Sequence, residues 1–477
     1  MSNLPNDSAS LRSLVLQLLK RVEVLESENE QLRLENSRLK KENTDLHTRL
    51  KQNSNNSHKP PSLDGYKKKP AIPKQKGKKT GGQKGHKGHT LQMVAVPDKV
   101  IVHHASHCSC CKKELQADQV SQITTKRQVF DIPEPKLEVV EHRIGIIHCC
   151  GQAHQGSFPS HVSAPVQYGN KIKAMVSLMN SEYRLPLEKI GQLFDDLYGH
   201  PINESSIVSA NAKLYETLQE PEQRIKEALL SQQLLHVDET GLRVTGKLHW
   251  LHTVCNKAYC YLFVHEKRGK QALYSAGSLL PDYTGCALHD CWKSYFEFEN
   301  CEHALCNAHI LRELNALMEQ GSIWAADMHQ LLLRLYSATD SGKGKVDNFT
   351  EWQLRYGAIC DQADKQEPRP IQSARGRPKN SKGRNLLNRL IKHGSSVLAF
   401  AQHEWIPFTN NLAEQAVRHA KVKQKVATCF RTFNGAQWYA RIQGFIITTR
   451  KQGQNTFKQI CQILDGKEYQ LSTLMTD

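Results

Sequence analysis

Three acidic residues that lie far apart along the chain are suited by type and position to hold divalent cations. Asp238 directly follows the apolar run 234–237, and Asp290 directly follows a second apolar run, 285–289. We predict both runs as strands, so the two carboxylates come together if these strands are neighbours in one sheet. Glu414 lies in the first turn of a predicted helix and can face the strand ends. Carboxylate oxygens are the hard ligands that Mg²⁺ or Mn²⁺ prefers, and paired ions of this kind serve displacement at phosphorus.

The elements around these acids are predicted as a meander of three strands, then a helix and a fourth strand. The second and third strands are expected at 248–254 and 258–264, and the helix at 270–280. The helix that carries Glu414 is expected at 412–423 with an Asn cap, and it places Arg418 on the face of Glu414. The interval between Asp290 and Glu414 is long, which predicts a helical insertion at about 325–356 followed by a basic linker.

The N-terminal segment has the heptad pattern of a parallel two-stranded coiled coil. The d positions are all leucine: Leu11, Leu18, Leu25, Leu32, Leu39 and Leu46. Asn29, Asn36 and Asn43 occupy a positions, where buried Asn penalises other registers and higher oligomers. The alternative is an amphipathic helix packed on its own domain, which does not need so long a leucine repeat. We therefore expect a homodimer.

The formal net charge of +17 is concentrated in stretches that are suited to nucleic acid. Ten lysines and one acid lie within 59–87, and eight basic residues without an acid lie within 369–392. Clustered cations displace the counterions of a phosphate backbone, so we expect double-stranded DNA as a partner. The glycine-rich run 81–89 lacks the spacing of a nucleotide loop, and 375–378 resembles either a minor-groove AT-hook or a solvated basic loop. The residues expected to contact DNA are Lys84, Lys87, Arg375, Arg377, Arg418, Lys421, Lys423, Lys425 and Arg431.

Two cysteine-rich knuckles between residues 91 and 165 indicate structural Zn²⁺. Cys108 and Cys111 form a C-x-x-C pair, and Cys150 lies in the second knuckle, after strand-like sequence at 128–132 and 137–147. The fourth ligand is open among His148, Cys149 and His154, of which we favour His148. Buried or reactive thiols without a metal are the alternative.

The region 166–230 is predicted to be helical, with helices at 186–197 and 205–218 around a Gly-His-Pro turn. These are helix-turn-helix proportions, so the second helix could enter a major groove, although helical hairpins are common. No apolar run approaches the ~20 residues of a membrane helix, and the polar N-terminus is not a signal peptide. We expect a cytoplasmic, nucleoid-associated protein without a membrane partner.

Long motifs give the chain a resemblance to a known family over nearly its whole length. The matching strings are 53–62, 81–89, 236–241, 306–309 and 407–414. They resemble the insertion-sequence sixty-six family of bacterial transposases, which is of the DDE class with a ribonuclease-H-like fold. The resemblance implies that Asp238, Asp290 and Glu414 are the metal-binding catalytic triad. It also implies that Cys306 and His309 are the C-x-x-H pair found after the second Asp, for which helix packing is the alternative.

The activity that the resemblance implies is metal-dependent cleavage at the ends of an insertion element and strand transfer into target DNA. Helper proteins encoded by the element are a further class of partner. The chain departs from the family pattern at Gln415, where an Arg is usual, and at Ile147, where the second knuckle usually has its first Cys. The alternative function is a catalytically inactive, zipper-dimerised DNA-binding regulator derived from a transposase.

The fold class that follows is multidomain, with an α/β ribonuclease-H-like catalytic domain at its centre. The expected parts are a leucine-zipper coiled coil (1–51), a basic linker (52–90), a zinc-ribbon-like β domain (91–165), a helix-turn-helix-like region (166–230), the catalytic domain (231–320 and 395–455), a helical insertion with a basic linker (321–394) and a C-terminal tail (456–477).

Overall fold

The structure is a computed structural model that describes residues 7–53, 56–57, 90–159, 161–339, 344–370 and 379–471. The chain divides into two compact units. The larger unit comprises Met1–Tyr66, Val166–Leu187 and Glu204–Asp477, and the smaller comprises Lys67–Pro165 and Glu188–Asn203. The run 81–89 and the predicted DNA contacts Lys84, Lys87, Arg375 and Arg377 lie outside the described residues.

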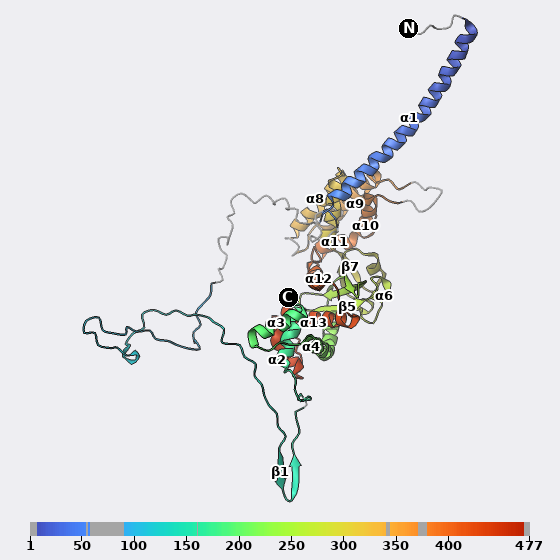
Figure 1. Cartoon of the computed structure of the whole chain (residues 1–477). Coiled ribbons are helices and arrows are strands. Elements are labelled where there is room, and N and C mark those ends of the chain that lie inside the picture. The colour runs from blue at the N-terminus through green and yellow to red at the C-terminus, as the bar shows by residue number, and fades with distance from the viewer. Residues whose placement is uncertain are drawn as a thin grey trace. The chain divides into compact units, whose positions relative to one another are not determined.

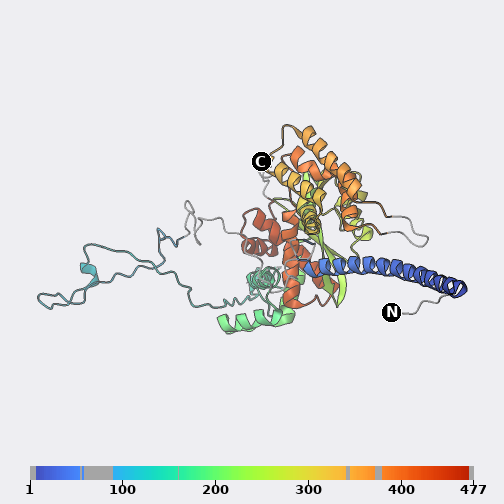
Figure 2. The same cartoon turned by 90° about the horizontal axis from the view of Figure 1, so that it is seen from above.

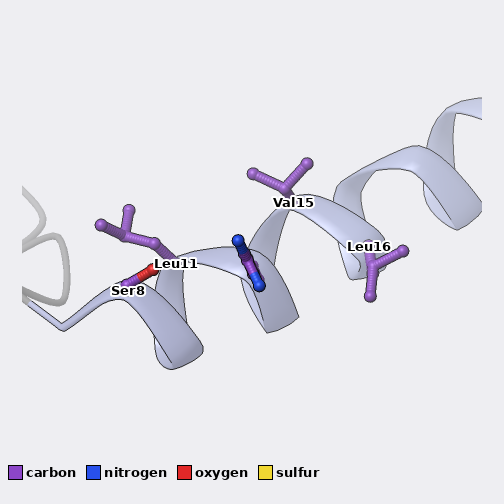
Figure 3. Close-up of a pocket in the computed structure, with 5 residues that line it drawn as sticks. Ser8, Leu11, Val15 and Leu16 are labelled. Atoms are coloured by element: carbon purple, nitrogen blue, oxygen red, sulfur yellow. The ribbon is translucent and has the colours of Figure 1, made fainter.

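Helix α1 (Ser8–Lys51) is one uninterrupted helix of 44 residues (Figures 1 and 2). It begins where the Asp7 carboxylate accepts hydrogen bonds from the backbone N–H groups of Ala9 (3.1 Å) and Ser10 (2.8 Å). Its heptad leucines are exposed in this single chain, for example Leu32 at 64%. Figure 3 shows Leu11 and Val15, neighbouring d and a residues, on the same side of the helix. The predicted helix is confirmed, and its apolar seam is exposed in this chain.

The described residues between 90 and 165, which belong to the smaller unit, contain little regular structure. Strands β1 (Ile146–Cys149) and β2 (Gln152–Gln155) form an antiparallel hairpin, and the short 3₁₀ helix η2 spans Ala117–Gln119. The hairpin turns at Cys150 and Gly151, both with positive φ, as two-residue hairpin turns require. None of the residues from 90 to 165 whose burial is described is buried. The longer predicted strands at 128–132 and 137–147 are wrong except for the last two residues, because these runs have no core to pack against.

A mixed five-stranded sheet forms the centre of the larger unit. Its strands are β3 (Leu234–Val244), β4 (Lys247–Cys255), β5 (Cys260–His265), β6 (Cys286–His289) and β7 (Glu302–Leu305). Their order is β5-β4-β3-β6-β7, with β3, β4 and β5 antiparallel and β6 and β7 parallel to β3. The predicted meander is confirmed, and the fourth strand, β6, lies beside the first, β3, which meets the condition on which the two acids were expected to lie close together.

Two predicted bounds in this region need correction. Strand β3 does not end at Asp238 but continues to Val244, because Leu242 and Val244 are buried and the whole run pairs with β4. The predicted helix 270–280 is helical only over α6 (Lys270–Leu273), followed by the 3₁₀ turn η3 (Leu280–Asp282). Gly277 lies between them against the Phe263 ring, where a Cβ would come within 2.9 Å, so the chain bends closely there.

Five helices pack into one core with the meander strands. They are α2 (Asn170–Ser181), α4 (Glu204–Thr217), α5 (Gln219–Leu230), α13 (Phe433–Lys451) and α14 (Thr456–Leu464). Leu214 of α4 and Leu229 of α5 share this core with Leu235 of β3. The region 166–230 is therefore not a separate domain, since α2, α4 and α5 share a core with the strands of the larger unit. We call this larger unit the sheet unit. The other helix of this region is α3 (Leu187–Tyr198), and all of it but Leu187 belongs to the smaller unit.

The prediction of a C-terminal tail at 456–477 is wrong in part, because residues 456–464 form helix α14 and pack in this core. Ile460 and Ile463 of α14 are buried in it, and the spacing of three residues places both on one face of the helix. Asn455 caps α14 by accepting the N–H of Lys458 at 3.0 Å. A helix of nine residues is not stable alone, so its apolar face depends on this packing.

The predicted helical insertion is present, but its helices share a core with strands β6 and β7, and residues 382–392 of the predicted basic linker are helical as well. Helices α8 (Ile323–Ala338), α9 (Phe349–Gln366) and α10 (Lys382–Lys392) pack with α7 (Asn307–Met318) and α11 (Gly394–Gln402). The core residues include Trp324, Leu332, Leu387 and Phe400, together with Leu288 of β6 and Leu305 of β7. The chain then returns to the sheet as α12 (Asn411–Ala427), whose Ala416 and Ala420 pack beside Leu242 of β3. No helix in the described part of the chain is long and apolar enough to cross a membrane.

Candidate active site

Asp238 and Asp290 lie at the same level of two neighbouring strands. Strands β3 and β6 are parallel, with His236 opposite Leu288, and each acid follows its strand partner by two residues. Strand β6 ends at His289, just before Asp290, whereas β3 continues and pairs only with β4 and not with β6. The register therefore places the two predicted acids at the same level of adjacent strands.

The third acid comes from the first turn of α12, and Asn410 ties the start of this helix to β3. The buried Asn410 amide donates from Nδ2 to the carbonyl of Val237 at 2.8 Å. Its Oδ1 lies 2.9 Å from Nδ1 of His236. Asn410 was predicted as a helix cap, but its side chain makes no capping hydrogen bond to α12 and bonds to the strand instead. It therefore fixes Glu414, one turn on, beside the strand that carries Asp238.

The electrostatics of the acids agree with their convergence. Burial raises the pKa of Asp238 well above its usual range, and the negative charges of Glu239, Asp290 and Glu414 raise it further. One oxygen of Asp238 accepts the N–H of Glu239 at 2.9 Å. One oxygen of Asp290 accepts the N–H of Trp292, also at 2.9 Å. The ligand atoms of Asp238, Asp290 and Glu414 do not all lie within 4.8 Å of one another in the described part of the chain. Their charges nevertheless disfavour one another, and carboxylate oxygens are the ligands that a hard divalent cation such as Mg²⁺ prefers.

Glu239, next to Asp238, is held in a cluster that the sequence did not indicate. Its Oε1 accepts hydrogen bonds from Arg268 at 2.8 and 2.5 Å, and its Oε2 accepts one from the Tyr295 hydroxyl. The Arg268 guanidinium lies 4.9 Å from the ring centroid of Trp250 and 4.4 Å from that of Trp292. Burial raises the pKa of Glu239, while Tyr295 and Arg268 act in the opposite direction. Both oxygens of Glu239 are engaged, so it supports the site rather than offering a free ligand.

Cys306 and His309 lie beside the third acid. Cys306 directly follows β7, and His309 is in the first turn of α7. Their ligand atoms and a carboxylate oxygen of Glu414 all lie within 4.8 Å of one another, with His309 Nδ1 3.9 Å from Glu414 Oε1. In the part of the chain that the structure describes, this is the one group of three or more His, Cys, Asp or Glu side chains gathered so closely. Burial raises the pKa of the Cys306 thiol to about 11, and the charge of Glu414 acts in the same direction.

The prediction that Lys423 contacts DNA is wrong. It is buried, its Nζ donates to the carbonyl of Asn180 at 2.7 Å, and burial lowers its pKa to about 8. The helical period places Lys423 on the same inner face as Ala416 and Ala420. This cation serves the packing of α12 and is not available at the surface.

The other described basic residues of this stretch are exposed. Arg418, whose side chain is 68% exposed, lies 3.9 Å from Glu414, as the spacing of four residues predicts. Lys421 donates to the carbonyl of Gly241 at 2.8 Å while remaining exposed. Lys425 and Arg431 are also exposed. A row of cations therefore begins at the acids and follows α12 outward.

The predicted zinc ligands lie in two separate turns of the smaller unit. Cys108 and Cys111 belong to a tight knuckle in which the N–H of Lys112 bonds to the carbonyl of Cys108 at 3.1 Å. Hydrogen bonds from Cys111 and Cys110 lower the pKa of the Cys108 thiol. His148 lies on β1 and Cys150 at the hairpin turn, next to Cys149. The described residues of the two knuckles do not form one ligand group, so the zinc site stays a prediction.

The sheet, its covering helices and the positions of the three acids indicate the class of protein. A central mixed sheet covered by helices, with an acid from each of two adjacent strands and a third from a later helix, is consistent with an α/β transposase domain. Comparison with known families then matches residues 165–438 to the Transposase IS66 family, which is more than half of the chain. The chain belongs to that family.

The match covers all three acids as well as Cys306 and His309. Residues 14–92, which include most of α1, match a second family that is described only as a family of unknown function, DUF6444. No curated protein matches the chain.

Proposed function

We propose that this transposase cleaves DNA at the ends of an insertion element and joins those ends to target DNA at Asp238, Asp290 and Glu414. The observation that supports the proposal is the register of β3 against β6, in which His236 and Leu288, each two residues before an acid, are paired. The hydrogen bonds of Asn410, which hold the start of α12 against β3, support Glu414 as the third member.

The chemistry consists of two phosphoryl transfers. In the first, water attacks a phosphodiester at the element end, the bond to the 3′ oxygen breaks, and a 3′-hydroxyl is released. In the second, that hydroxyl attacks a target phosphodiester, so one ester bond forms as another breaks. Bound Mg²⁺ or Mn²⁺ would activate the attacking oxygen and stabilise the leaving one. The three carboxylates would hold the ions, and the Glu239–Arg268 pair would keep the strand beside Asp238 in place.

The DNA would lie along the exposed cations that follow Glu414. Arg418, Lys421, Lys425 and Arg431 are the described candidates, and Lys84, Lys87, Arg375 and Arg377 remain candidates from the sequence. Because phosphate contacts displace counterions, Arg418→Ala combined with Lys425→Ala should weaken binding to every DNA sequence and reduce its salt dependence by about two charges. Lys423→Ala is the matched control, since Lys423 is buried and should not change the salt dependence.

We further propose a homodimer formed through α1 and a structural zinc site in the smaller unit. The exposed leucine seam of α1 supports the dimer. Deletion of residues 1–51 should convert a dimer to a monomer in light scattering, and an unchanged mass would contradict the zipper. For zinc, metal-free protein after purification without chelators would contradict the site at Cys108, Cys111, Cys150 and His148.

The decisive experiment is paired cleavage and strand transfer of element-end DNA with Mg²⁺. Asp238→Ala and Glu414→Gln should abolish both reactions while DNA binding is retained. Strand transfer at the wild-type level by either variant would refute the assignment. Wild-type protein that binds the ends but neither cuts nor joins them would favour the inactive regulator instead.

A further inference from the structure

Cys306, His309 and Glu414 form a donor set that differs from that of the two aspartates. A thiol, an imidazole and a carboxylate meet where β7, α7 and α12 converge, with their ligand atoms within 4.8 Å of one another. Thiolate and imidazole are the ligands that Zn²⁺ and similar ions prefer, whereas Mg²⁺ prefers oxygen alone. The two neighbouring clusters are therefore suited to different metals.

A second observation points to a ligand at this place. The Oε1 atom of Glu414 is buried and accepts no hydrogen bond from the residues that the structure describes. Burial of a carboxylate oxygen without a partner costs free energy, and such atoms in native proteins call for an explanation such as a bound ion. This oxygen is the one that faces His309, at 3.9 Å from Nδ1, while Oε2 lies 3.9 Å from Arg418.

The backbone around Cys306 and His309 is fixed before any ion binds. The N–H of Cys306 donates to the carbonyl of His289 at 2.8 Å, which holds it at the end of the sheet. The N–H of Asn410 donates to the Cys306 sulfur at 3.2 Å, and the N–H of His309 donates to the carbonyl of Cys306 at 3.2 Å. Asn410 therefore connects this cluster to the same strand that carries Asp238. Such preorganisation favours ion binding because few groups need to be ordered.

We propose that Cys306 Sγ, His309 Nδ1 and Glu414 Oε1 bind a thiophilic divalent cation of the Zn²⁺ class, and that its binding inhibits the transposase. The inhibition rests on the proposed function, because an ion held here takes Glu414 away from Asp238 and Asp290. Three protein ligands leave a fourth tetrahedral position open for water. On binding, the thiol loses its proton to solvent, and nothing is oxidised or reduced.

Cobalt binding tests the site without reference to activity. The full chain should carry Ser at the five cysteines of the two knuckles, Cys108, Cys110, Cys111, Cys149 and Cys150, so that the predicted zinc knuckles offer no thiolate for Co²⁺. Titration should give a thiolate-to-cobalt charge-transfer band with one ion per chain. Cys306→Ser should remove the band, and His309→Ala or Glu414→Gln should weaken binding by more than about 100-fold, since these are direct ligands.

Cys461→Ser is the matched control, because Cys461 is a partly buried thiol on α14 outside the cluster. It should leave the cobalt band unchanged. The serine in Cys306→Ser retains an acceptor for the N–H of Asn410, so its fold can be checked by circular dichroism, and His309→Ala provides an independent variant. Absence of a band, or a band that persists in Cys306→Ser, would overturn the site.

The inhibition is tested by adding Zn²⁺ to strand-transfer reactions in Mg²⁺. Wild type and Cys461→Ser should lose activity and regain it with a chelator, whereas Cys306→Ser should need at least about tenfold more Zn²⁺ for the same loss. Equal inhibition of Cys306→Ser and wild type would overturn the inhibitory role. A Cys306-dependent cobalt band in a protein without any strand transfer would support the metal site and contradict the proposed function, so the two failures are distinguishable.

Discussion

The sheet unit and residues 90–165 hold their candidate metal ligands in opposite ways. Around the sheet, Asp238 and Glu414 are held by strand pairing and by buried side-chain hydrogen bonds such as those of Asn410. In residues 90–165, Cys111 and Cys150 are exposed on turns, and no described residue is buried. The first region positions its ligands by packing, whereas the second would need its metal to acquire a fold. Candidate metal ligands in one chain can therefore differ in whether the fold around them depends on a bound ion.

Removal of zinc should give the largest effect and should act on one region only. Structural zinc sites contribute on the order of 10 kcal/mol of binding free energy, so chelation should unfold residues 90–165 and leave the sheet unit folded. Limited proteolysis with and without a zinc chelator measures this, and Cys108→Ser should reproduce the chelated pattern. Identical cleavage under all three conditions would remove the contrast.

Asp238→Asn should separate activity from stability within the sheet unit. Strand transfer should fall by at least on the order of 10³-fold, or about 4 kcal/mol. Because the folded protein raises the pKa of Asp238, its carboxylate destabilises the metal-free fold at neutral pH, and the substitution should raise the melting temperature in chelator. A lower melting temperature would mean that the acid is needed for packing.

Asn410→Ala should damage both the position of Glu414 and the stability of the sheet unit. Loss of its bonds to Val237 and His236 leaves buried groups unpaired and should lower the free energy of unfolding by about 2–4 kcal/mol. Misplacement of Glu414 should reduce strand transfer by about 100-fold. The neighbouring Asn411 is exposed, so Asn411→Ala is the control. Equal effects in melting and transfer assays of the two variants would argue against the role of Asn410.

The smallest effect concerns acid sensitivity of the sheet unit through His252 on β4. Burial lowers the pKa of His252 to about 4, and its ring stacks on Phe263 with 4.8 Å between centroids. Because the unfolded imidazole binds a proton near pH 6.5, stability should fall as the pH drops from 6.5 towards 4. The loss at pH 5 is about 2 kcal/mol. His252→Phe should flatten this part of a melting-temperature profile, and an unaltered slope would contradict it.

Much of the sheet and of the proposed acid site could be predicted from the sequence because local patterns carry it. Apolar runs of four or five residues that end on an acid indicated the strands before Asp238 and Asp290, whereas the pairing of these two strands was only a condition of the prediction. The supporting contacts could not be predicted, because they depend on register and packing between remote segments. Arg268 between Trp250 and Trp292, and the buried position of Lys423, are both of this kind.

The predicted helix boundaries were wrong where packing between remote segments determines whether a segment is helical. The amphipathic segment at 456–464 is only nine residues long and was predicted as part of a tail, yet Ile460 and Ile463 complete the core of the sheet unit. The predicted helix after β5 stopped early near Gly277, whose tight approach to Phe263 is visible only in three dimensions.

The helical insertion between β7 and α12 also has a consequence for the timing of folding. Glu414 follows Asp290 by more than 100 residues, which include the whole of α8, α9 and α10. Ribosomes add ~5–20 residues per second, so roughly 6–25 s separate the synthesis of the second acid from that of the third. A nascent chain therefore exposes two strand-end carboxylates well before the set is complete. The order of the polypeptide itself would therefore delay any activity of the proposed site until Glu414 has been synthesised.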